Sequence, residues 1–463
     1  MRPELVAGSI LRSGWRASVI VRAPVPQGHH RNPPRVAGVI DIVGIGDGGL
    51  ADLPQRSRDL ILGARVLVGG RRHLDLIPDV PGQERHGWPT PLKAGLPAML
   101  TNVDAYAAPP GAVVVLASGD PLRSGVGTTI RNLVGADGVR IHPHVSSDTL
   151  ARARMAWSAE DTTVLTLVGR GVDALRQHLD PGAHLVLLCS NGTTPAQIAG
   201  LLTSEGLGHS QLTAWWHLGG PAEGTRAATA ADWDTTPTPD LVVVCAVIDR
   251  DQALAHPALS TAPGLPEAAY ETDGQLTKRD VRASALAHLR PWRGGRLWDL
   301  GAGTGTVGIE WARAAEGATT IAVEQHPERA ARIRANATHL GVSRAVTVIE
   351  TDVLTAASDP DLPAPDAVFV GGGLTRDLLT AAWDRLTPGG RFVAHAVTLG
   401  TEAILLDAHA RLGGHLTRIT IEHATPLGRH LSWTPARPVV QWSATKPAAP
   451  QPGSRHTDTP TTP

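Results

Sequence analysis

The sequence is poor in lysine, cysteine and aromatic residues. Lysine occurs only at Lys93, Lys278 and Lys446, so arginine supplies nearly all of the positive charge. Acidic and basic side chains almost cancel, with a formal net charge of −1, and aromatic residues make up 3 % of the chain. Nucleic-acid binding needs a basic face and stacking rings. The composition therefore argues against nucleic acid, or a charged membrane surface, as a main partner.

Cysteine and histidine patterns are equally sparse. Cys189 and Cys245 each end an apolar run, no CxxC pair is present, and the histidines show no recurring ligand spacing. The sequence thus predicts neither a disulfide framework nor a metal site. No apolar run is long enough to cross a bilayer, and the N-terminal region lacks the apolar core of a secretory signal. We expect a cytoplasmic protein.

Apolar runs that alternate with helical patterns predict an α/β protein with more than one domain. The Arg- and Pro-containing start and the Pro/Thr-rich end favour disorder. The expected division is a disordered leader at 1–37, two α/β lobes at 38–248, a linker at 249–265, a third α/β unit at 266–443 and a disordered tail at 444–463.

The third unit is predicted to finish with two antiparallel strands. Residues 416–423 and 437–442 both alternate between apolar and polar side chains. An antiparallel pair after parallel strands is typical of a Rossmann-like methyltransferase and not of a nicotinamide-binding domain.

The segment Arg296–Gly305 (RLWDLGAGTG) is the most informative stretch of the chain. It reads as a short apolar strand that ends near Asp299 and enters a glycine-rich turn, after which a helical pattern begins. Glycines there allow the backbone to approach a ligand closely, and a helix N-terminus offers unpaired N–H groups. The segment predicts a ligand site at a strand-to-helix turn.

Two further acids follow the next two predicted strands. Glu324 ends the strand at 319–323, about twenty residues after the glycine turn, where an acid can hold two ribose hydroxyls. Asp352 follows the strand at 345–349, within reach of an adenine amino group. Three acids on successive strands favour S-adenosylmethionine over a nicotinamide nucleotide. A purely structural turn and a dinucleotide oxidoreductase remain the alternatives.

The first half contains a GxGxxG sequence, Gly44–Gly49, after a predicted strand. The next strand, 66–68, ends without an acid, so the ribose acceptor of a dinucleotide fold is missing. Ser118–Pro121 follows a strong strand and reads either as an Asp-Pro turn or as part of a site. Val145–Ser147 begins a helix, where a serine can simply be the N-cap.

Taken together and in order, these motifs resemble the tetrapyrrole methylase family, in the branch that methylates carbon 5 of precorrin-6Y. The motifs are Val43–Gly46, Gly69–Leu74, Leu116–Pro121, Val145–Ser147, Gly169–Arg170 and Leu218–Glu223. The resemblance spans about 39–247 and implies S-adenosylmethionine folded in a cleft between two lobes. It implies cofactor contacts at Gly44, Gly46, Ser118, Gly119 and Asp120. The chain departs from the family at Asp47, where proline is usual, and near Leu122 and Val168.

The third unit resembles the carbon-15 methylase and decarboxylase of the same pathway. The motifs are Leu276–Arg282, Leu297–Gly305, Ile309–Glu310 and Pro365–Gly373. Fused in this order, the halves resemble the family of decarboxylating precorrin-6Y C5,15-methyltransferases of cobalamin biosynthesis. The resemblance implies a tetrapyrrole substrate, methylation at carbons 5 and 15, loss of the ring C acetate carboxyl, one S-adenosylmethionine per methyltransferase domain and a homo-oligomer. The implied cofactor residues are Thr277, Gly301, Ala302, Gly303, Thr304, Gly305, Glu324, Asp352 and Val353. Thr277 also reads locally as a helix N-cap with an acid three residues on.

No nucleophile-and-base group is expected, because a sulfonium methyl is already electrophilic and reduced tetrapyrrole carbons are electron-rich. We predict no specific catalytic residue. The many carboxylates of such a substrate favour arginine as a partner. The candidate substrate-binding residues are Arg279, Arg282, Arg123 and Arg170, for which a solvated helix or loop face is the alternative.

Two other functions are compatible with the sequence. An RNA base methyltransferase would use only the third unit, although the scarce aromatics and balanced charge oppose it. A fusion whose first site is a non-catalytic binding scaffold would explain the departures near Leu122 and Val168.

Overall fold

The computed structural model describes residues 38–103, 109–256 and 260–448. The predicted leader at 1–37 and the end of the predicted tail, from 449 on, lie outside the described residues. Ala444, which we expected to begin the tail, instead lies in the last strand and is 7 % exposed. No helix in the described ranges is long and apolar enough to cross a membrane.

The first lobe is an all-parallel five-stranded sheet in the order β3-β2-β4-β1-β5. Two of its central strands, β2 and β4, are mainly continuous runs of Val and Leu, as expected for a parallel sheet that is covered on both faces. The elements are β1 (Ile40–Ile45), η1 (Gly49–Asp52), α1 (Gln55–Gly63), β2 (Val66–Gly69), α2 (Arg71–Asp75), β3 (Glu84–Gly87), α3 (Leu92–Asn102), β4 (Val113–Ser118), α4 (Val126–Val134) and β5 (Val139–His142).

The second lobe is a mixed five-stranded sheet in the order β6-β7-β10-β8-β9, in which only β6 and β7 are parallel. Its core includes both cysteines, Cys189 and Cys245, which are buried free thiols. The elements are α5 (Ser147–Met155), β6 (Thr162–Thr166), η2 (Val172–His178), β7 (His184–Leu188), α6 (Thr194–Ser204), β8 (Gln211–Trp216), β9 (Gly224–Thr229) and β10 (Val242–Val247). The expected linker contains a further helix, α7 (Arg250–Ala255).

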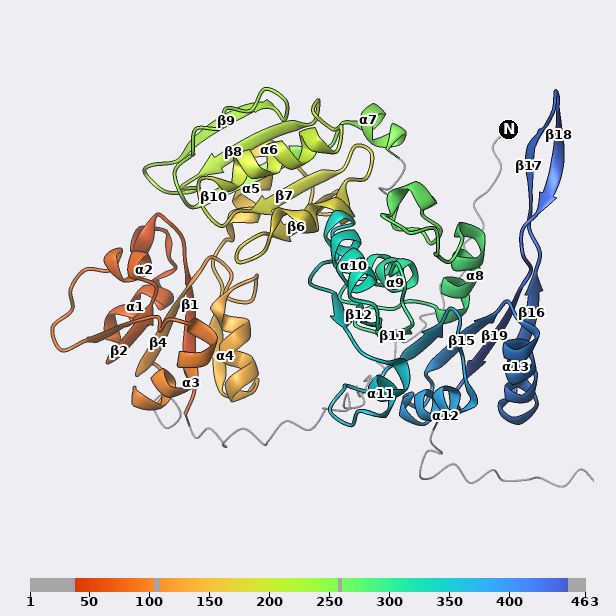
Figure 1. The fold of residues 1–463 in the computed structure, drawn as a ribbon. Coiled ribbons are helices and arrows are strands. Elements are labelled where there is room, and N and C mark those ends of the chain that lie inside the picture. The colour runs from red at the N-terminus through yellow and green to blue at the C-terminus, as the bar shows by residue number, and fades with distance from the viewer. Residues whose placement is uncertain (1–37, 104–108, 257–259, 449–463) are drawn as a thin grey trace, which may run out of the picture.

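The third unit is a seven-stranded sheet in the order β13-β12-β11-β14-β15-β19-β16, covered by α8–α10 on one face and α11–α13 on the other (Figure 1). Its elements are η3 (Glu267–Ala269), α8 (Arg279–Leu289), β11 (Arg296–Leu300), α9 (Thr306–Ala314), β12 (Thr319–Val323), α10 (Pro327–His339), β13 (Val346–Ile349), α11 (Val353–Ser358), β14 (Ala367–Val370), α12 (Arg376–Arg385), β15 (Arg391–Ala396), α13 (Leu399–Leu412), β16 (His415–Ile419), β17 (Glu422–Leu427), β18 (His430–Pro435) and β19 (Val439–Thr445).

Several of the chain's few aromatic rings pack together inside this unit. Trp442 of β19 lies 5.5 Å from Phe392 of β15 and 5.9 Å from Trp383, measured between ring centroids. Trp442 is completely buried, and removing such a ring costs on the order of 3–5 kcal/mol. This cluster anchors the antiparallel strand β19 between β15 and β16.

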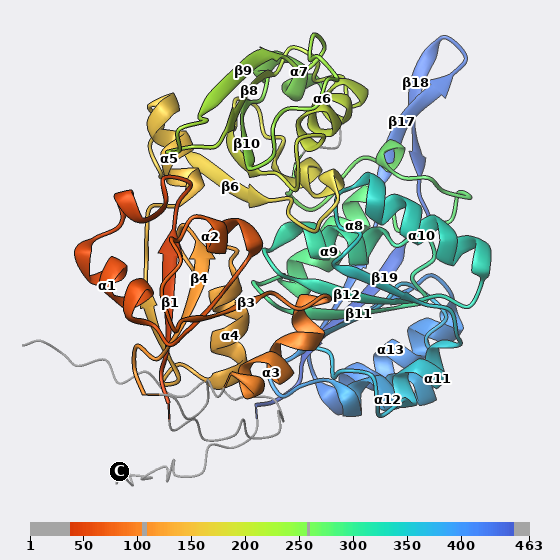
Figure 2. The same ribbon diagram turned by 90° about the vertical axis from the view of Figure 1, so that its left-hand side faces the viewer.

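The C-terminal strands are antiparallel as predicted, but their connection differs from the prediction. β19 pairs antiparallel with both β15 and β16. Between β16 and β19 the chain forms a separate two-stranded hairpin, β17–β18, which projects away from the body (Figures 1 and 2). Consequently Arg437, expected in the last strand, lies just before it.

The second lobe and the third unit are joined by direct hydrogen bonds. The Gln177 side chain of η2 donates to the Gly341 carbonyl at 2.5 Å, and Ser343 donates to Asp173 at 2.6 Å. Arg344 reaches the Gly169 carbonyl at 2.8 Å. These contacts link η2 and the loop at Gly169 to the segment between α10 and β13.

Candidate functional site

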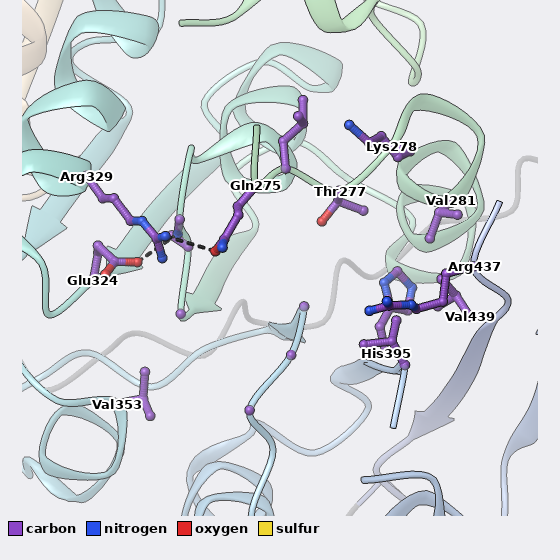
Figure 3. A pocket seen from close by; sticks show the side chains of 18 of the residues that line it. Gln275, Thr277, Lys278, Val281, Glu324, Arg329, Val353, His395, Arg437 and Val439 are labelled. Carbon is purple, nitrogen blue, oxygen red and sulfur yellow. Dashed lines mark hydrogen bonds between the residues drawn. The ribbon is translucent and has the colours of Figure 1, made fainter. Parts of the chain in front are cut away.

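A cavity of about 1510 Å³ opens at the carboxyl ends of the parallel strands in the third unit. One wall is the turn that follows β11, and a second is the segment Gln275–Asp280 at the start of α8. A third wall is formed by strands near the end of the chain, β15, β16 and β19 (Figure 3). Ligands of open α/β sheets bind in this place.

The glycine-rich turn is shaped by its backbone. Gly301 and Gly303 have φ values of +75° and +59°, a left-handed conformation that glycine adopts without strain. The N–H groups of Gly301 and Ala302 both donate to the Val323 carbonyl at 3.0 Å. The Gly303 N–H donates to Glu324 at 2.9 Å. These three N–H groups are therefore not available to a pyrophosphate, whereas a dinucleotide-binding loop offers such groups to its ligand.

Glu324 ends β12 with its carboxylate facing the cavity (Figure 3). It is 5 % exposed, and its two oxygens accept the N–H groups of Gly303 and His326 at 2.9 and 3.0 Å. Two fixed donors hold the carboxylate in one orientation and leave further lone pairs for ligand hydroxyls.

Asp352 and Val353 lie across the cavity at the start of α11. One Asp352 oxygen caps this helix by accepting the N–H groups of Leu354 and Thr355 at 2.9 and 3.1 Å. The other carboxylate oxygen has no such contact and remains available to a ligand amino group.

The remaining expected cofactor residues divide into two groups. Thr277 lines the cavity, but Lys278 is the N-cap of α8, so the predicted threonine cap is wrong. Thr304 and Gly305 do not line the cavity. Thr304 is 2 % exposed and donates to the Gln275 carbonyl at 2.9 Å, while a Cβ on Gly305 would lie 2.8 Å from Ile333. These two residues shape the turn instead of facing the ligand.

Asp299, the first of the three predicted acids, also has a structural role and does not face the cavity. It is 2 % exposed and accepts the Gly308 N–H of α9 at 3.0 Å. Burial raises the pKa of the Asp299 carboxyl to about 7. It joins strand to helix beneath the turn and does not line the cavity.

Of the four arginines predicted to bind substrate, Arg282 was predicted wrongly. Its side chain is fully buried and donates to Glu310 at 2.6 Å, and to the carbonyls of Thr277 and Leu265. With its donors used inside the protein, Arg282 cannot bind substrate. Arg279 lines the cavity and is exposed.

The two arginine candidates in the first half lie in different settings. Arg123 is paired with Asp148 of α5 at 3.0 Å, which links the first lobe to the second. Arg170 is exposed on the loop beside Gly169.

The structure brings the predicted glycine motifs of the first half together. A Cβ on Gly44 would lie 1.8 Å from the Gly119 carbonyl, and one on Gly119 would lie 2.8 Å from Ser146. Ser118 and Asp120 flank Gly119 at the end of β4, and Gly46 follows β1 beside His144. Three separate motifs thus meet at one edge of the parallel sheet.

Next to these glycines is a polar cluster that the motifs did not predict. Asp47 accepts from Arg72 at 3.0 Å and contacts His217 of the second lobe at 2.9 Å. His73 lies 3.1 Å from the Ser118 hydroxyl, and burial, assisted by Arg72, lowers the pKa of His73 to about 4. The sequence signal for this cluster was Asp47, which stands where the family usually has proline.

His395 of β15 is a second residue that sequence reasoning missed. It lines the cavity although it is 2 % exposed, and its Nε2 donates to Gln441 at 3.0 Å. Burial lowers the pKa of His395 to about 4, so the ring is neutral at physiological pH.

The parallel strand order, the antiparallel β19 and a cavity with an acid at the end of the second strand define a class I methyltransferase fold. Residues 268–446 match the family described as "Precorrin methyltransferase domain". Residues 39–233 match "Tetrapyrrole (Corrin/Porphyrin) Methylases".

Full-length relatives combine both parts. A protein named "Precorrin-6Y C(5,15)-methyltransferase [decarboxylating]" from Sinorhizobium sp. is 42 % identical over 89 % of this chain and 98 % of its own length. The protein of that name from Mycobacterium tuberculosis H37Rv is 40 % identical over 88 % of this chain and 100 % of its own. The chain belongs to the family of decarboxylating precorrin-6Y C5,15-methyltransferases.

A shorter relative matches only part of this chain. It comes from Pyrobaculum aerophilum and is named "Probable cobalt-precorrin-6B C(15)-methyltransferase (decarboxylating)". It is 32 % identical over 38 % of this chain and 93 % of its own length.

Proposed function

We propose that this protein methylates a precorrin at carbons 5 and 15 and removes the carboxyl group of the ring C acetate, as a step of cobalamin biosynthesis. The observation that carries the proposal is that relatives matched over 98 % or more of their own length bear this name, and that they span both halves of the chain. The name of the shorter relative supports the third unit as the site of carbon-15 methylation and decarboxylation.

The cavity of the third unit fits S-adenosylmethionine, a cofactor that the family implies. Glu324 would hold the ribose hydroxyls, Asp352 and Val353 would hold the adenine, and Gly301, Ala302, Gly303 and Thr277 would surround the rest. The engaged N–H groups of the turn suit a ligand without phosphate. When bound, this cofactor supplies an electrophilic methyl group.

The protein's own contribution is to position the two reactants and exclude water. Loss of carbon dioxide leaves an electron pair, which the conjugated macrocycle can accept before a proton is added to the side-chain carbon. No activated serine or cysteine is needed, in keeping with the two buried thiols, whose pKa values burial raises to about 12.

We propose the same cofactor for the first half, at Gly44, Gly46, Ser118, Gly119 and Asp120. The convergence of these motifs at one sheet edge supports this assignment. The proposed division is a carbon-5 methylase at 38–248 and a carbon-15 methylase and decarboxylase at about 266–445. The free buried cysteines support a cytoplasmic location.

We also propose that the protein is a homo-oligomer assembled through the β17–β18 hairpin. Leu427, Leu431 and Trp433 on this hairpin are 66 %, 72 % and 69 % exposed. An isolated two-stranded hairpin is marginally stable in water, so a second copy that covers these side chains would stabilise it.

The test uses the full-length protein with methyl-labelled S-adenosylmethionine and precorrin-6Y, with methyl incorporation at each carbon and carbon dioxide release as readouts. The wild type should add two methyl groups and release one carbon dioxide. Glu324→Gln should slow carbon-15 methylation and decarboxylation at a limiting cofactor concentration. Gly44→Val, which places a side chain against the Gly119 carbonyl, should lose carbon-5 methylation.

The same experiment, repeated with RNA in place of the precorrin, separates the alternatives. A single methyl, at carbon 15, would mean that the first half is only a binding scaffold. Methyl transfer to RNA without transfer to the precorrin would replace the proposal with an RNA methyltransferase.

A further inference from the structure

The two ends of the third-unit cavity differ in charge. The end proposed for the cofactor contains the carboxylates of Glu324 and Asp352, and Arg329, which also lines it, is paired with Asp273 at 3.0 Å. The opposite end is walled by β15, β16 and β19 and by the residues just before β19. The total volume of about 1510 Å³ exceeds the roughly 300–1,000 Å³ of an ordinary small-molecule pocket, so a second molecule fits beside the cofactor.

The strand wall at this opposite end is largely aliphatic, and the described residues that line it include no carboxylate. Val397, Ile419, Ile421, Ala436 and Val439 provide its aliphatic surface.

The polar groups of the same wall are two histidines, His395 and His423, and the guanidinium of Arg437. His395 is neutral because burial lowers its pKa to about 4. Among the described residues of this wall, Arg437 is therefore the one permanent charge that faces the cavity.

Arg437 is free to bind a ligand. It is exposed and forms no ion pair with any carboxylate among residues 38–103, 109–256 and 260–448. Its side chain lies at the same end of the cavity as His395 and Val439 (Figure 3).

The facing wall at the start of α8 carries charges of both signs. Lys278 and Arg279 add cations, whereas Asp280 and Glu267 add carboxylates. Glu267 accepts the backbone N–H of Arg279 at 2.9 Å, so a carboxylate lies beside these cations. Of the cations that line this end, Arg437 is thus the one with the fewest carboxylates nearby. A carboxylate of the ligand would bind there most favourably.

We propose that Arg437 anchors a peripheral carboxylate of the tetrapyrrole, while the aliphatic wall beside it packs against the macrocycle. This inference rests on the proposed function and names the substrate-binding end of that site. The anchored carboxylate is one that the reaction retains, because an ion pair to the departing carboxyl would stabilise the ground state more than the transition state, in which its charge moves into the ring. A guanidinium can bind a carboxylate through two parallel hydrogen bonds, which fixes orientation as well as position.

The experiment compares Arg437→Gln and Arg437→Lys with a control, Arg293→Gln. Arg293 is 78 % exposed in a surface ion pair with Glu316 and lies outside the cavity lining. For each full-length variant, KM and kcat for carbon-15 methyl transfer to precorrin-6Y are measured, together with tetrapyrrole binding by fluorescence quenching without turnover. S-adenosylmethionine binding is measured by calorimetry.

Arg437→Gln should raise KM and the tetrapyrrole Kd by roughly 10- to 100-fold, the range for a charge-assisted hydrogen bond. Binding of S-adenosylmethionine should change by less than about twofold, Arg437→Lys should recover part of the loss, and Arg293→Gln should behave as wild type. Unchanged tetrapyrrole binding in Arg437→Gln, or an equal loss of cofactor binding, would overturn the inference. A wild type that methylates no precorrin would instead overturn the proposed function.

Discussion

The guanidinium of Arg282 lies fully buried, 2.6 Å from the carboxylate of Glu310. Glu310 also accepts the N–H groups of Gly264 and Leu265 and the hydroxyl of Tyr270. This network ties the start of α8, which forms one wall of the cavity, to α9 and to the segment that enters the third unit. The Arg282–Glu310 pair therefore holds this wall of the cavity in place without lining the cavity itself.

Replacing Arg282 with methionine should lower the free energy of unfolding by about 3–5 kcal/mol, because it leaves the Glu310 charge buried without its partner. Denaturant unfolding of the full-length protein measures the effect. Arg293→Gln, which breaks an exposed pair, should cost no more than about 1 kcal/mol. If Arg282→Met were as stable as wild type but bound the tetrapyrrole poorly, the original assignment of Arg282 to the substrate would be restored.

Glu324→Gln should weaken S-adenosylmethionine binding in the third unit by about tenfold or more, because charge-assisted hydrogen bonds to the ribose are replaced by neutral ones. Calorimetric titration should then resolve one weakened site and one unchanged site per chain. Glu328→Gln, which changes an exposed acid in the first turn of α10 outside the cavity lining, is the matched control. Equal affinity of Glu324→Gln and wild type would remove Glu324 from the cofactor site.

Asp299→Asn should change how stability depends on pH. The Asp299 pKa of about 7 in the folded protein lies above its value near 3.9 in an unfolded chain. As pH rises from about 4 to about 7, the unfolded carboxyl ionises while the folded one stays protonated, so wild type loses stability from this group. Asparagine cannot ionise and can still accept the Gly308 N–H.

The stability of Asp299→Asn relative to wild type should therefore increase across this window, by up to about 1.4 kcal/mol per pH unit, and then level off above pH 7. Denaturant unfolding at a series of pH values tests this expectation. A difference that is flat between pH 4 and 7 would contradict it.

The parallel strands could be predicted from sequence, because strands buried on both faces are continuous apolar runs. The strand predicted at 319–323 coincides with β12. The role of Arg282 could not be predicted, because its burial depends on Glu310, a partner 28 residues away. The Asp47–His217 contact joins residues 170 apart, and no local pattern encodes it.

The β17–β18 hairpin escaped prediction for a different reason. β18 is exposed at every position and β17 at all but one, so the alternation of buried and exposed residues that marks a strand is missing.

Trp433→Ser combined with Leu431→Ser should shift the protein toward smaller assemblies, because the change removes apolar surface proposed to lie between copies. Sedimentation velocity at several protein concentrations measures the shift. Leu399→Ser, at an 84 % exposed leucine at the start of α13, controls for the general loss of a surface apolar group. A wild type that sediments as a monomer at all concentrations would reject the assembly.

Asp47→Ala should slow carbon-5 methylation while it leaves carbon-15 methylation intact. Asp47 joins Arg72 of the first lobe to His217 of the second, and Gly220 of the second lobe approaches so closely that a Cβ there would lie 2.4 Å from the Asp47 carboxylate. Without Asp47 the lobes lose a direct link beside the proposed cofactor motifs, so the reactants would be held less closely in line.

We expect a loss of about tenfold in the rate of carbon-5 methylation, as for one or two partly buried charge-assisted hydrogen bonds. The position of the label in the product, determined by NMR, separates the two methylations. Asp59→Ala removes an exposed acid of α1 and should change neither methylation. Equal losses at both carbons in Asp47→Ala would mean that the contact supports the whole chain and not the first site. Unchanged carbon-5 methylation would mean that the lobes hold their arrangement without it.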